Sequence, residues 1–186
     1  MDDLEAVRRL KHGDIGGLEL LIARYQAKAV RTAYLVTCDA QAAEEVVQEA
    51  FIRFYERARQ FDESRAFEPY FLRMVVHAAL NQVEHESHAT LSLDEDAGLY
   101  KIERLLASAS PVEDQVEYEQ LKHAIHTAIG ALSPRLRAVA VQRYYLEMSE
   151  TEMSAALDVA PGTVKWLLHT ARSRLRTLLG WQRSEE

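Results

Sequence analysis

The chain has 186 residues, of which 48% are hydrophobic and 27% are charged. This balance can supply a hydrophobic core and excludes a wholly disordered chain, and 7 Gly and 4 Pro exclude a fibrous or low-complexity one. A net charge of −7 argues against a protein that coats nucleic acid without sequence preference. The length allows one large domain or two small ones.

Charge is distributed unevenly along the chain. Residues 85–117 carry two basic and eight acidic side chains, whereas residues 161–184 carry five basic side chains and no acidic one. We therefore expect the C-terminal segment, and not the middle of the chain, to meet an anionic partner.

The number of cysteines and the N-terminal sequence indicate the cellular compartment of the protein. Cys38 is the single cysteine, so no internal disulfide can form, and no Cys/His pattern supplies four zinc ligands. The first residues are acidic where a secretory signal is basic, and no stretch approaches about 18 uninterrupted apolar residues. We expect a cytoplasmic protein without membrane insertion, metal site or cofactor.

The N-terminal half shows apolar residues at helical spacing, and no alternating strand pattern occurs anywhere in the chain. The spacing predicts helices around residues 18–29, from about Asp39 to residue 55, and over residues 71–83, with a loop over residues 61–65. Each has one apolar stripe, so the helices can bury one another as a bundle. The predicted fold class is all-α.

Helical periodicity fails over residues 85–115, where Ser, Asp, Glu, His and Ala dominate. We interpret this segment as an acidic linker with a short helix over residues 99–106. The resulting division is a domain at 1–86, a linker at 87–117 and a second domain at 118–186.

The C-terminal half begins with a helical stripe over residues 121–132. Ser133 is predicted to cap the following helix, which has Pro134 at its first position and continues through Tyr144. Ser149 and Glu152 have the spacing of a capping box and start a short helix.

That short helix is predicted to run through Leu157 and to end in a turn over residues 158–160. Pro161 then opens a longer helix that ends near Gly180. A short helix, a three-residue turn and a longer helix form the helix-turn-helix pattern.

A basic row lies on this last helix. Lys165, His169, Arg172 and Arg176 are spaced at i, i+4, i+7 and i+11, so they share one face. A second helix with a basic edge suits insertion into the major groove, where Lys and Arg reach guanine edges or phosphates. A solvated basic face is the competing interpretation.

The order of these segments resembles the extracytoplasmic-function (ECF) sigma factors of bacterial RNA polymerase, a group within the sigma-70 family. The motifs that match sigma region 4 are Leu132-Ser133-Pro134-Arg135-Leu136-Arg137, Tyr144, Ser149, Glu152, Leu157, Gly162-Thr163-Val164-Lys165, Leu168-His169 and Ala171-Arg172. The motifs that match sigma region 2 are Gly13-Asp14, Leu18, Leu21, Tyr25, residues 43–51, the loop from Phe61 to Phe67, and Tyr70. Two sets of motifs in the family's order are more specific than either set alone.

The resemblance implies a non-enzymatic factor that binds both core RNA polymerase and promoter DNA. On the polymerase it implies contacts to the beta-prime clamp and the beta flap. An anti-sigma factor is a further candidate partner. It implies docking on the clamp by Glu45, Gln48, Glu49 and Phe51. It implies capture of the melted −10 strand by an aromatic and basic set that suits single-stranded DNA, namely Phe61, Arg65, Phe67, Tyr70 and Arg73. Ordinary packing is the competing interpretation for Phe67 and Tyr70. It implies −35 recognition by Thr163, Lys165, Trp166, His169, Arg172 and Arg176.

The chain departs from the family pattern in two places. Residues 77–86 lack the usual basic cluster, and Trp166, Leu167 and Thr170 stand where serine and arginine are usual. Two alternatives therefore stay open. One is a divergent co-sigma or decoy that docks on polymerase without recognising promoters itself, and the other is a helix-turn-helix repressor.

Overall fold

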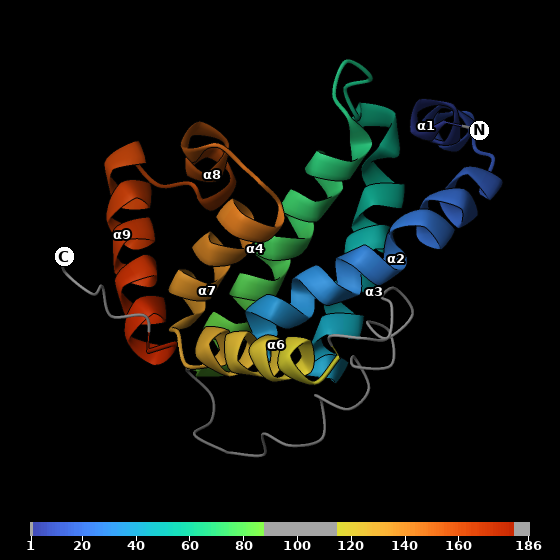
Figure 1. Ribbon diagram of the computed structural model, residues 1–186. Helices are drawn as coiled ribbons and strands as arrows, with labels where there is room; N and C mark the ends of the chain where they lie inside the picture. The colour runs from blue at the N-terminus through green and yellow to red at the C-terminus, as the bar shows by residue number, and fades with distance from the viewer. Residues whose placement is uncertain (1, 88–114, 181–186) are drawn as a thin grey trace. The chain divides into compact units, whose positions relative to one another are not determined.

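The computed structural model describes the backbone of residues 2–87 and 115–180 and the side chains of residues 2–85 and 122–180. The chain divides into two compact units, residues 1–90 and residues 91–186 (Figure 1). Over the described ranges the ordered elements are helices, without a strand. The all-α prediction is confirmed. The predicted helix over residues 99–106 and most of the predicted linker lie outside the described residues.

The N-terminal unit opens with a helix that was not predicted from the apolar spacing, α1 (Asp3–Lys11), followed by α2 (Gly16–Thr37). The Asp2 carboxylate caps α1 by accepting a hydrogen bond from the backbone N–H of Leu4 at 2.5 Å. Gly17 lets the two helices approach closely, because a Cβ there would lie 2.2 Å from the carbonyl oxygen of Ala6.

The next helices are α3 (Ala40–Arg57), the 3-10 turn η1 (Ala58–Gln60) and α4 (Phe67–Ser87). Asp39 caps α3, as predicted, by accepting from the N–H of Ala42 at 2.7 Å. The helix α2 packs against α1, α3 and α4, and α3 also packs against α4 (Figure 1). This arrangement makes a helical bundle of the predicted kind.

Aromatic rings fill the centre of this unit. Phe54 is 1% exposed, and its ring centroid lies 4.8 Å from that of Phe67 and 5.8 Å from that of Phe61. Phe67 also contacts Tyr25 at 5.2 Å, so α2, α3 and α4 meet at one cluster. Tilted and edge-on ring pairs of this kind add to the burial energy.

The C-terminal unit has five described elements. They are α6 (Gln115–Gly130), α7 (Pro134–Ala140), the π-helix η2 (Val141–Tyr145), α8 (Glu150–Leu157) and α9 (Pro161–Leu178). Its core is built from α7, α8 and α9, with Met153, Val139 and Val164 fully buried together. The predicted prolines at the starts of α7 and α9 are confirmed.

Two local predictions in this unit need correction. Ser133 occupies the N-cap position of α7, as predicted, but its side chain makes no capping hydrogen bond. The start of α7 therefore depends on Pro134, whose fixed φ suits a first helical turn. The helix also does not continue as an α-helix through Tyr144. It widens to η2, where the N–H of Leu146 bonds to the carbonyl of Val141, five residues earlier, at 3.0 Å.

Candidate nucleic-acid interfaces

The helix-turn-helix consists of α8, the turn over residues 158–160, and α9. The capping box is confirmed: the Ser149 side chain accepts from the Glu152 N–H at 3.3 Å, and Glu152 accepts from the Ser149 N–H at 2.9 Å. Asp158 ends α8 in the left-handed conformation, with φ of 52°. The Ser154 hydroxyl donates to the carbonyl of Val159 at 2.6 Å and closes the turn. These contacts fix the direction in which α9 leaves α8.

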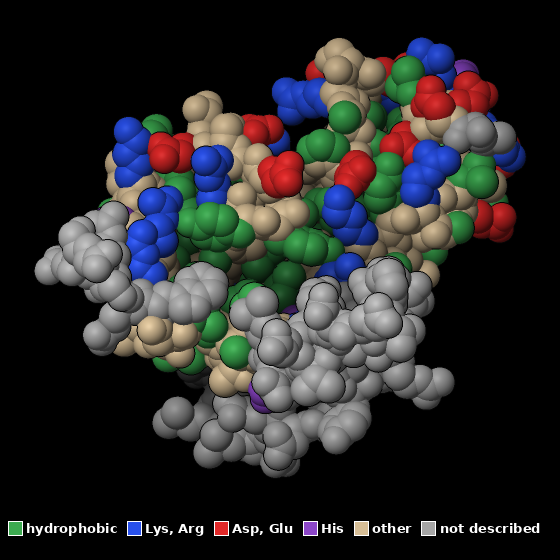
Figure 2. Space-filling model, viewed as in Figure 1, with side chains coloured by type: hydrophobic (Ala, Val, Ile, Leu, Met, Phe, Trp, Pro, Cys, Tyr) green, Lys and Arg blue, Asp and Glu red, His purple; other side chains and the backbone are tan. Residues whose placement is uncertain are grey.

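One side of α9 is buried and the rest is open to solvent. Val164, Leu168 and Ala171 are at most 3% exposed and face the core. The predicted contact residues Thr163, Lys165, Trp166, His169, Arg172 and Arg176 are all exposed. Figure 2 shows basic side chains gathered along α9. Leu167, which the sequence grouped with Trp166, is 8% exposed and belongs to the core, whereas Trp166 is 64% exposed.

Two cations of the basic row have partners on the elements before α9. The guanidinium Nε of Arg172 donates to the hydroxyl of Tyr144 at 3.0 Å, and Tyr144 is itself exposed on η2. Lys165 Nζ lies 4.0 Å from a carboxylate oxygen of Glu150, at the start of α8. Tyr144 therefore orients Arg172, while Glu150 competes with an incoming phosphate for Lys165.

A second exposed stripe runs along α3. The predicted docking residues Glu45, Gln48 and Glu49 are exposed on it, and Ile52 and Tyr55 extend it with apolar surface at 57% and 45% exposure. These five positions follow helical spacing, so the stripe could have been extended from the sequence.

The fourth predicted docking residue lies under this stripe. Phe51 is 5% exposed and packs against Phe71 of α4, with the rings tilted by 32° and a centroid distance of 4.3 Å. Its ring cannot touch a partner on the surface of α3. Three of the four predicted docking residues are therefore exposed on α3, and the fourth is buried beneath them.

A third group surrounds the 61–66 loop between η1 and α4. Arg65 is exposed, and Tyr70 and Arg73 on α4 are partly exposed. Phe61 and Phe67 are 7% and 3% exposed, so neither offers a ring face to a nucleotide as the sequence analysis expected. Burial explains the difference, because both rings pack on Phe54 in the aromatic cluster.

The 61–66 loop is tightly hydrogen-bonded. The Asp62 carboxylate accepts from the N–H of Ser64 at 3.0 Å and from its hydroxyl at 2.7 Å, and these bonds lower the pKa of Asp62. Arg65 Nε lies 3.3 Å from the other Asp62 oxygen. The pKa of Glu63 is lowered by hydrogen bonds from Lys11 and then Arg8, both on α1. The loop therefore keeps its carboxylates ionised and paired at neutral pH.

Several of these residues carried no functional assignment in the sequence analysis. Glu63 lies 55 positions from Arg8 and 52 from Lys11, and no local pattern joins it to them. Tyr144 was assigned only to a helix and to a family motif. Its neighbour Arg172 is 28 positions away, so only the fold brings the two together.

The geometry defines an all-helical protein with a helix-turn-helix in its second unit and an exposed polar and apolar stripe on α3 in its first. Family models agree: "Sigma-70 region 2" matches residues 21–88 and "Sigma-70, region 4" matches residues 122–175. The chain belongs to the sigma-70 family, within its ECF group. This family is not a class of enzymes. No helix among the described residues has the length and apolar character that a membrane crossing needs.

Relatives match along nearly the whole chain. The ECF RNA polymerase sigma factor SigW of Bacillus subtilis is 27% identical over 176 residues, which cover 93% of this chain and 94% of SigW. The ECF RNA polymerase sigma-E factor of Escherichia coli K12 is 28% identical over 180 residues, which cover 94% of this chain and 93% of the relative.

Solved structures share the fold. CnrH in complex with the cytosolic domain of CnrY matches with a TM-score of 0.64 and 18% identity, covering 97% of this chain and 99% of that chain. The sigma factor RpoE of Bartonella quintana, in complex with the anti-sigma factor NepR, matches with a TM-score of 0.63 and 14% identity, covering 89% and 98% of the two chains.

Proposed function

We propose that this protein binds core RNA polymerase and directs it to promoters, as a sigma factor without catalysis of its own. Residues 1–86 dock on the polymerase and engage the −10 element, residues 118–186 bind the −35 element, and residues 87–117 link the two. The observation that carries the proposal is the exposed basic row of α9, held by a capped α8 in helix-turn-helix geometry. Membership of the sigma-70 family supports the assignment of both units.

The −35 element is recognised by the exposed surface of α9. Lys165 and Arg172 donate to guanine edges or phosphates in the major groove, and His169 and Arg176 continue the same row. Tyr144 adds to this site by fixing the direction of the Arg172 guanidinium. Thr163 lies in the first turn of α9, and the exposed Trp166 ring offers an apolar contact to thymine methyl groups.

Polymerase docking uses the α3 stripe. Glu45, Gln48 and Glu49 supply polar contacts to the beta-prime clamp, and Ile52 and Tyr55 supply exposed apolar area. Polar groups around an apolar centre are the usual composition of a specific protein interface. Phe51 supports the stripe from beneath by packing on Phe71.

The −10 strand is engaged around the 61–66 loop. Arg65 and Arg73 supply cations for the DNA backbone, and Tyr70 supplies an aromatic ring at the surface. Phe61 and Phe67 do not contact DNA themselves, and contribute by anchoring the two ends of the loop with their buried rings.

The protein works in the cytoplasm, where its polymerase and promoter DNA are found. The beta flap is a second contact on the polymerase, for the C-terminal unit. The two solved relatives are complexes, one with the cytosolic domain of CnrY and the other with the anti-sigma factor NepR. We propose that an anti-sigma factor likewise restrains this chain.

Run-off transcription tests the function directly. Purified core polymerase is incubated with genomic fragments of the source organism, with and without the protein, and the 5′ ends of the transcripts are mapped. Discrete new start sites that share −10 and −35 sequences are the expected result. Polymerase binding without start sites would favour the decoy, and binding to a palindromic duplex without polymerase would favour a repressor.

The −35 assignment is tested by charge removal on α9. Lys165→Ala and Arg172→Ala are expected to weaken promoter binding by the holoenzyme roughly tenfold each, because a good base-edge contact is worth about 1–3 kcal/mol. Affinity for core polymerase should not change. Arg174→Ala is the matched control: it removes the same charge from the same helix, but at the far edge of the exposed surface. Equal losses for all three variants would refute the assignment of the basic row.

A further inference from the structure

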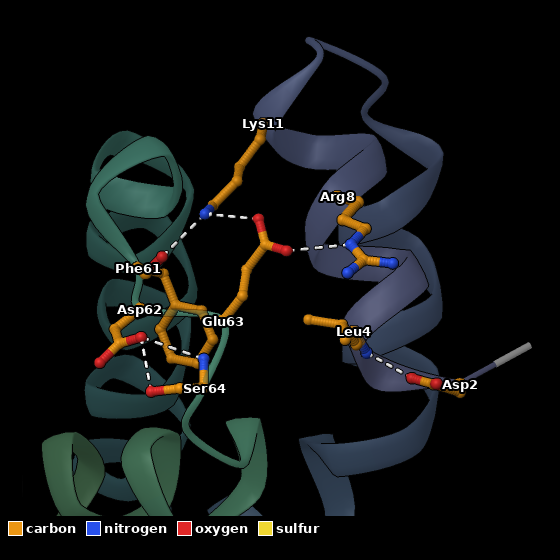
Figure 3. Close-up of polar contacts among 8 residues, drawn as sticks. All are labelled: Asp2, Leu4, Arg8, Lys11, Phe61, Asp62, Glu63 and Ser64. Carbon is orange, nitrogen blue, oxygen red and sulfur yellow. Dashed lines mark hydrogen bonds and ion pairs between the residues drawn. The ribbon is translucent and has the colours of Figure 1, made fainter.

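An ion-paired contact joins α1 to the 61–66 loop (Figure 3). Glu63 extends from the loop between two cations of α1, with one carboxylate oxygen 2.8 Å from Lys11 Nζ and the other 2.9 Å from Arg8 Nε. Lys11 also donates to the backbone carbonyl of Phe61 at 2.8 Å. One lysine therefore holds both the start of the loop and a side chain at its centre.

The α1 end of this contact is firmly placed. Ala6, Val7 and Leu10 bury the apolar face of α1, and Gly17 lets the helix lie directly on α2. Asp3 adds polar contacts to Arg24 and Tyr25 of α2. A helix fixed along its length can hold a loop that by itself has mainly local hydrogen bonds.

Burial makes the interaction of Lys11 with Glu63 stronger than that of Arg8 with Glu63. The Lys11 side chain is 20% exposed, compared with 51% for Arg8, so solvent and salt screen it less. The bond to the Phe61 carbonyl fixes the backbone where the loop leaves η1. The bond to Glu63 fixes the loop two residues further on, beside Asp62 and Ser64.

We propose that Lys11, through Glu63 and the Phe61 carbonyl, is a positioning residue that sets the base selectivity of the 61–66 loop for unpaired promoter DNA. This inference rests on the proposed −10 role of the loop. Lys11 itself need not touch DNA. It restricts the loop to one conformation, so that a correct base gains its contacts without first ordering the loop.

The contact also neutralises the negative charge of Glu63. An unpaired Glu63 would repel DNA phosphates beside Arg65, whereas its pairing with Lys11 and Arg8 leaves the group with one net positive charge. The contact between Lys11 and Glu63 thus holds the loop in place and also neutralises a negative charge that would repel DNA.

A promoter library tests the proposal. Holoenzyme made with the full chain transcribes templates whose −10 region is randomised, and transcripts are counted for wild type, Lys11→Met, Glu63→Gln and the double variant. We expect each single variant to lower the preference for the best base at one or two positions by about fivefold, the upper range for a pair of this exposure. The double variant should lose less selectivity than the two single losses multiplied together, because the bond between Lys11 and Glu63 is broken in both single variants.

Conservative and matched variants separate positioning from general stability. Lys11→Arg keeps the charge and the donors and should restore most of the selectivity. Arg9→Gln removes a cation from the same helix, but one that pairs with Asp14, and should leave base preference at the wild-type level. Glu63→Gln lies on the surface loop and keeps its size, so the test does not depend on α1 tolerating a change at Lys11.

The outcomes separate this proposal from the proposed function. If wild type gives no sequence-specific transcripts, the promoter role itself fails. If wild type is selective and both single variants keep its base preferences, positioning by Lys11 is refuted. A uniform loss of transcription with Lys11→Met, together with normal preferences for Glu63→Gln, would also refute it, because Lys11 would then act only on stability.

Discussion

Replacing Ser149 by alanine removes the side chain that closes the first turn of α8. In the native structure the Ser149 hydroxyl accepts from the Glu152 N–H at 3.3 Å and donates to the Glu152 carboxylate at 2.8 Å. The variant loses both bonds but keeps the bond from the Ser149 backbone N–H to Glu152, at 2.9 Å. The perturbation therefore removes half of a reciprocal cap and leaves the buried core untouched.

The geometry sets the size of the effect. Loss of a serine cap costs about 0.5–2 kcal/mol, and this cap lies at the lower end because its bond to the helix N–H is long and water reaches the site. We expect the free energy of unfolding of the C-terminal unit to fall by about 0.5–1 kcal/mol. With a urea slope of about 1 kcal/mol/M for a small unit, the midpoint falls by about 0.5–1 M.

Urea unfolding followed by NMR is a suitable assay. Resolved amide signals from α8 and α9 report the unfolding of the C-terminal unit alone. Ser173→Ala is the matched control, because it makes the same chemical change at an exposed interior position of α9. Alanine is the better helix former there, so the control should raise the midpoint slightly.

The sign difference between the two variants is the decisive result. Equal shifts for Ser149→Ala and Ser173→Ala would refute the claim that the cap stabilises α8. A double variant, Ser149→Ala with Glu152→Ala, should cost less than the sum of the two single changes, because each residue serves the other. Strict additivity would show that the two side chains act independently.

Gly17→Ala should destabilise the N-terminal unit by about 1–3 kcal/mol in urea unfolding followed by circular dichroism, since its Cβ would lie 2.2 Å from the carbonyl oxygen of Ala6. Phe54→Ala should cost about 3–5 kcal/mol in the same assay, because it empties the centre of the aromatic cluster. The Glu63 carboxyl, followed by NMR, should titrate below its ordinary pKa of 4.5, and Lys11→Met should raise that midpoint. Because the pKa of Glu63 is lower in the folded protein, its ion pair stabilises the fold at pH values above the ordinary pKa of the carboxyl. This stabilisation is lost as the pH falls through the lowered, folded-state pKa.

Local features of the fold were predictable because their causes are local. Asp39 caps α3, Pro161 opens α9, and Ser149 and Glu152 form their box within four residues of one another. Short-range hydrogen bonds and a fixed proline φ do not depend on the rest of the chain. The exposure of the basic row on α9 follows equally from helical spacing and the apolar stripe beside it.

Predictions failed where packing decides the outcome. Composition marks Phe61 and Phe67 as stacking platforms, but burial energy draws both rings into the cluster around Phe54. The sequence also left open whether Leu167 and Trp166 are packed or exposed, and the structure separates them, since Leu167 faces the core and Trp166 the solvent. Sequence spacing cannot give the width of a buried face, which depends on what packs against it.

The helical class, the helix-turn-helix and the acidic and basic surfaces follow from local sequence, because helical periodicity and capping are encoded within a few residues. The contact of Lys11 with Glu63 and the orientation of Arg172 by Tyr144 depend on the tertiary structure. These pairs join elements that are distant in the chain. Their contact depends on how helices pack against one another, which no local pattern records.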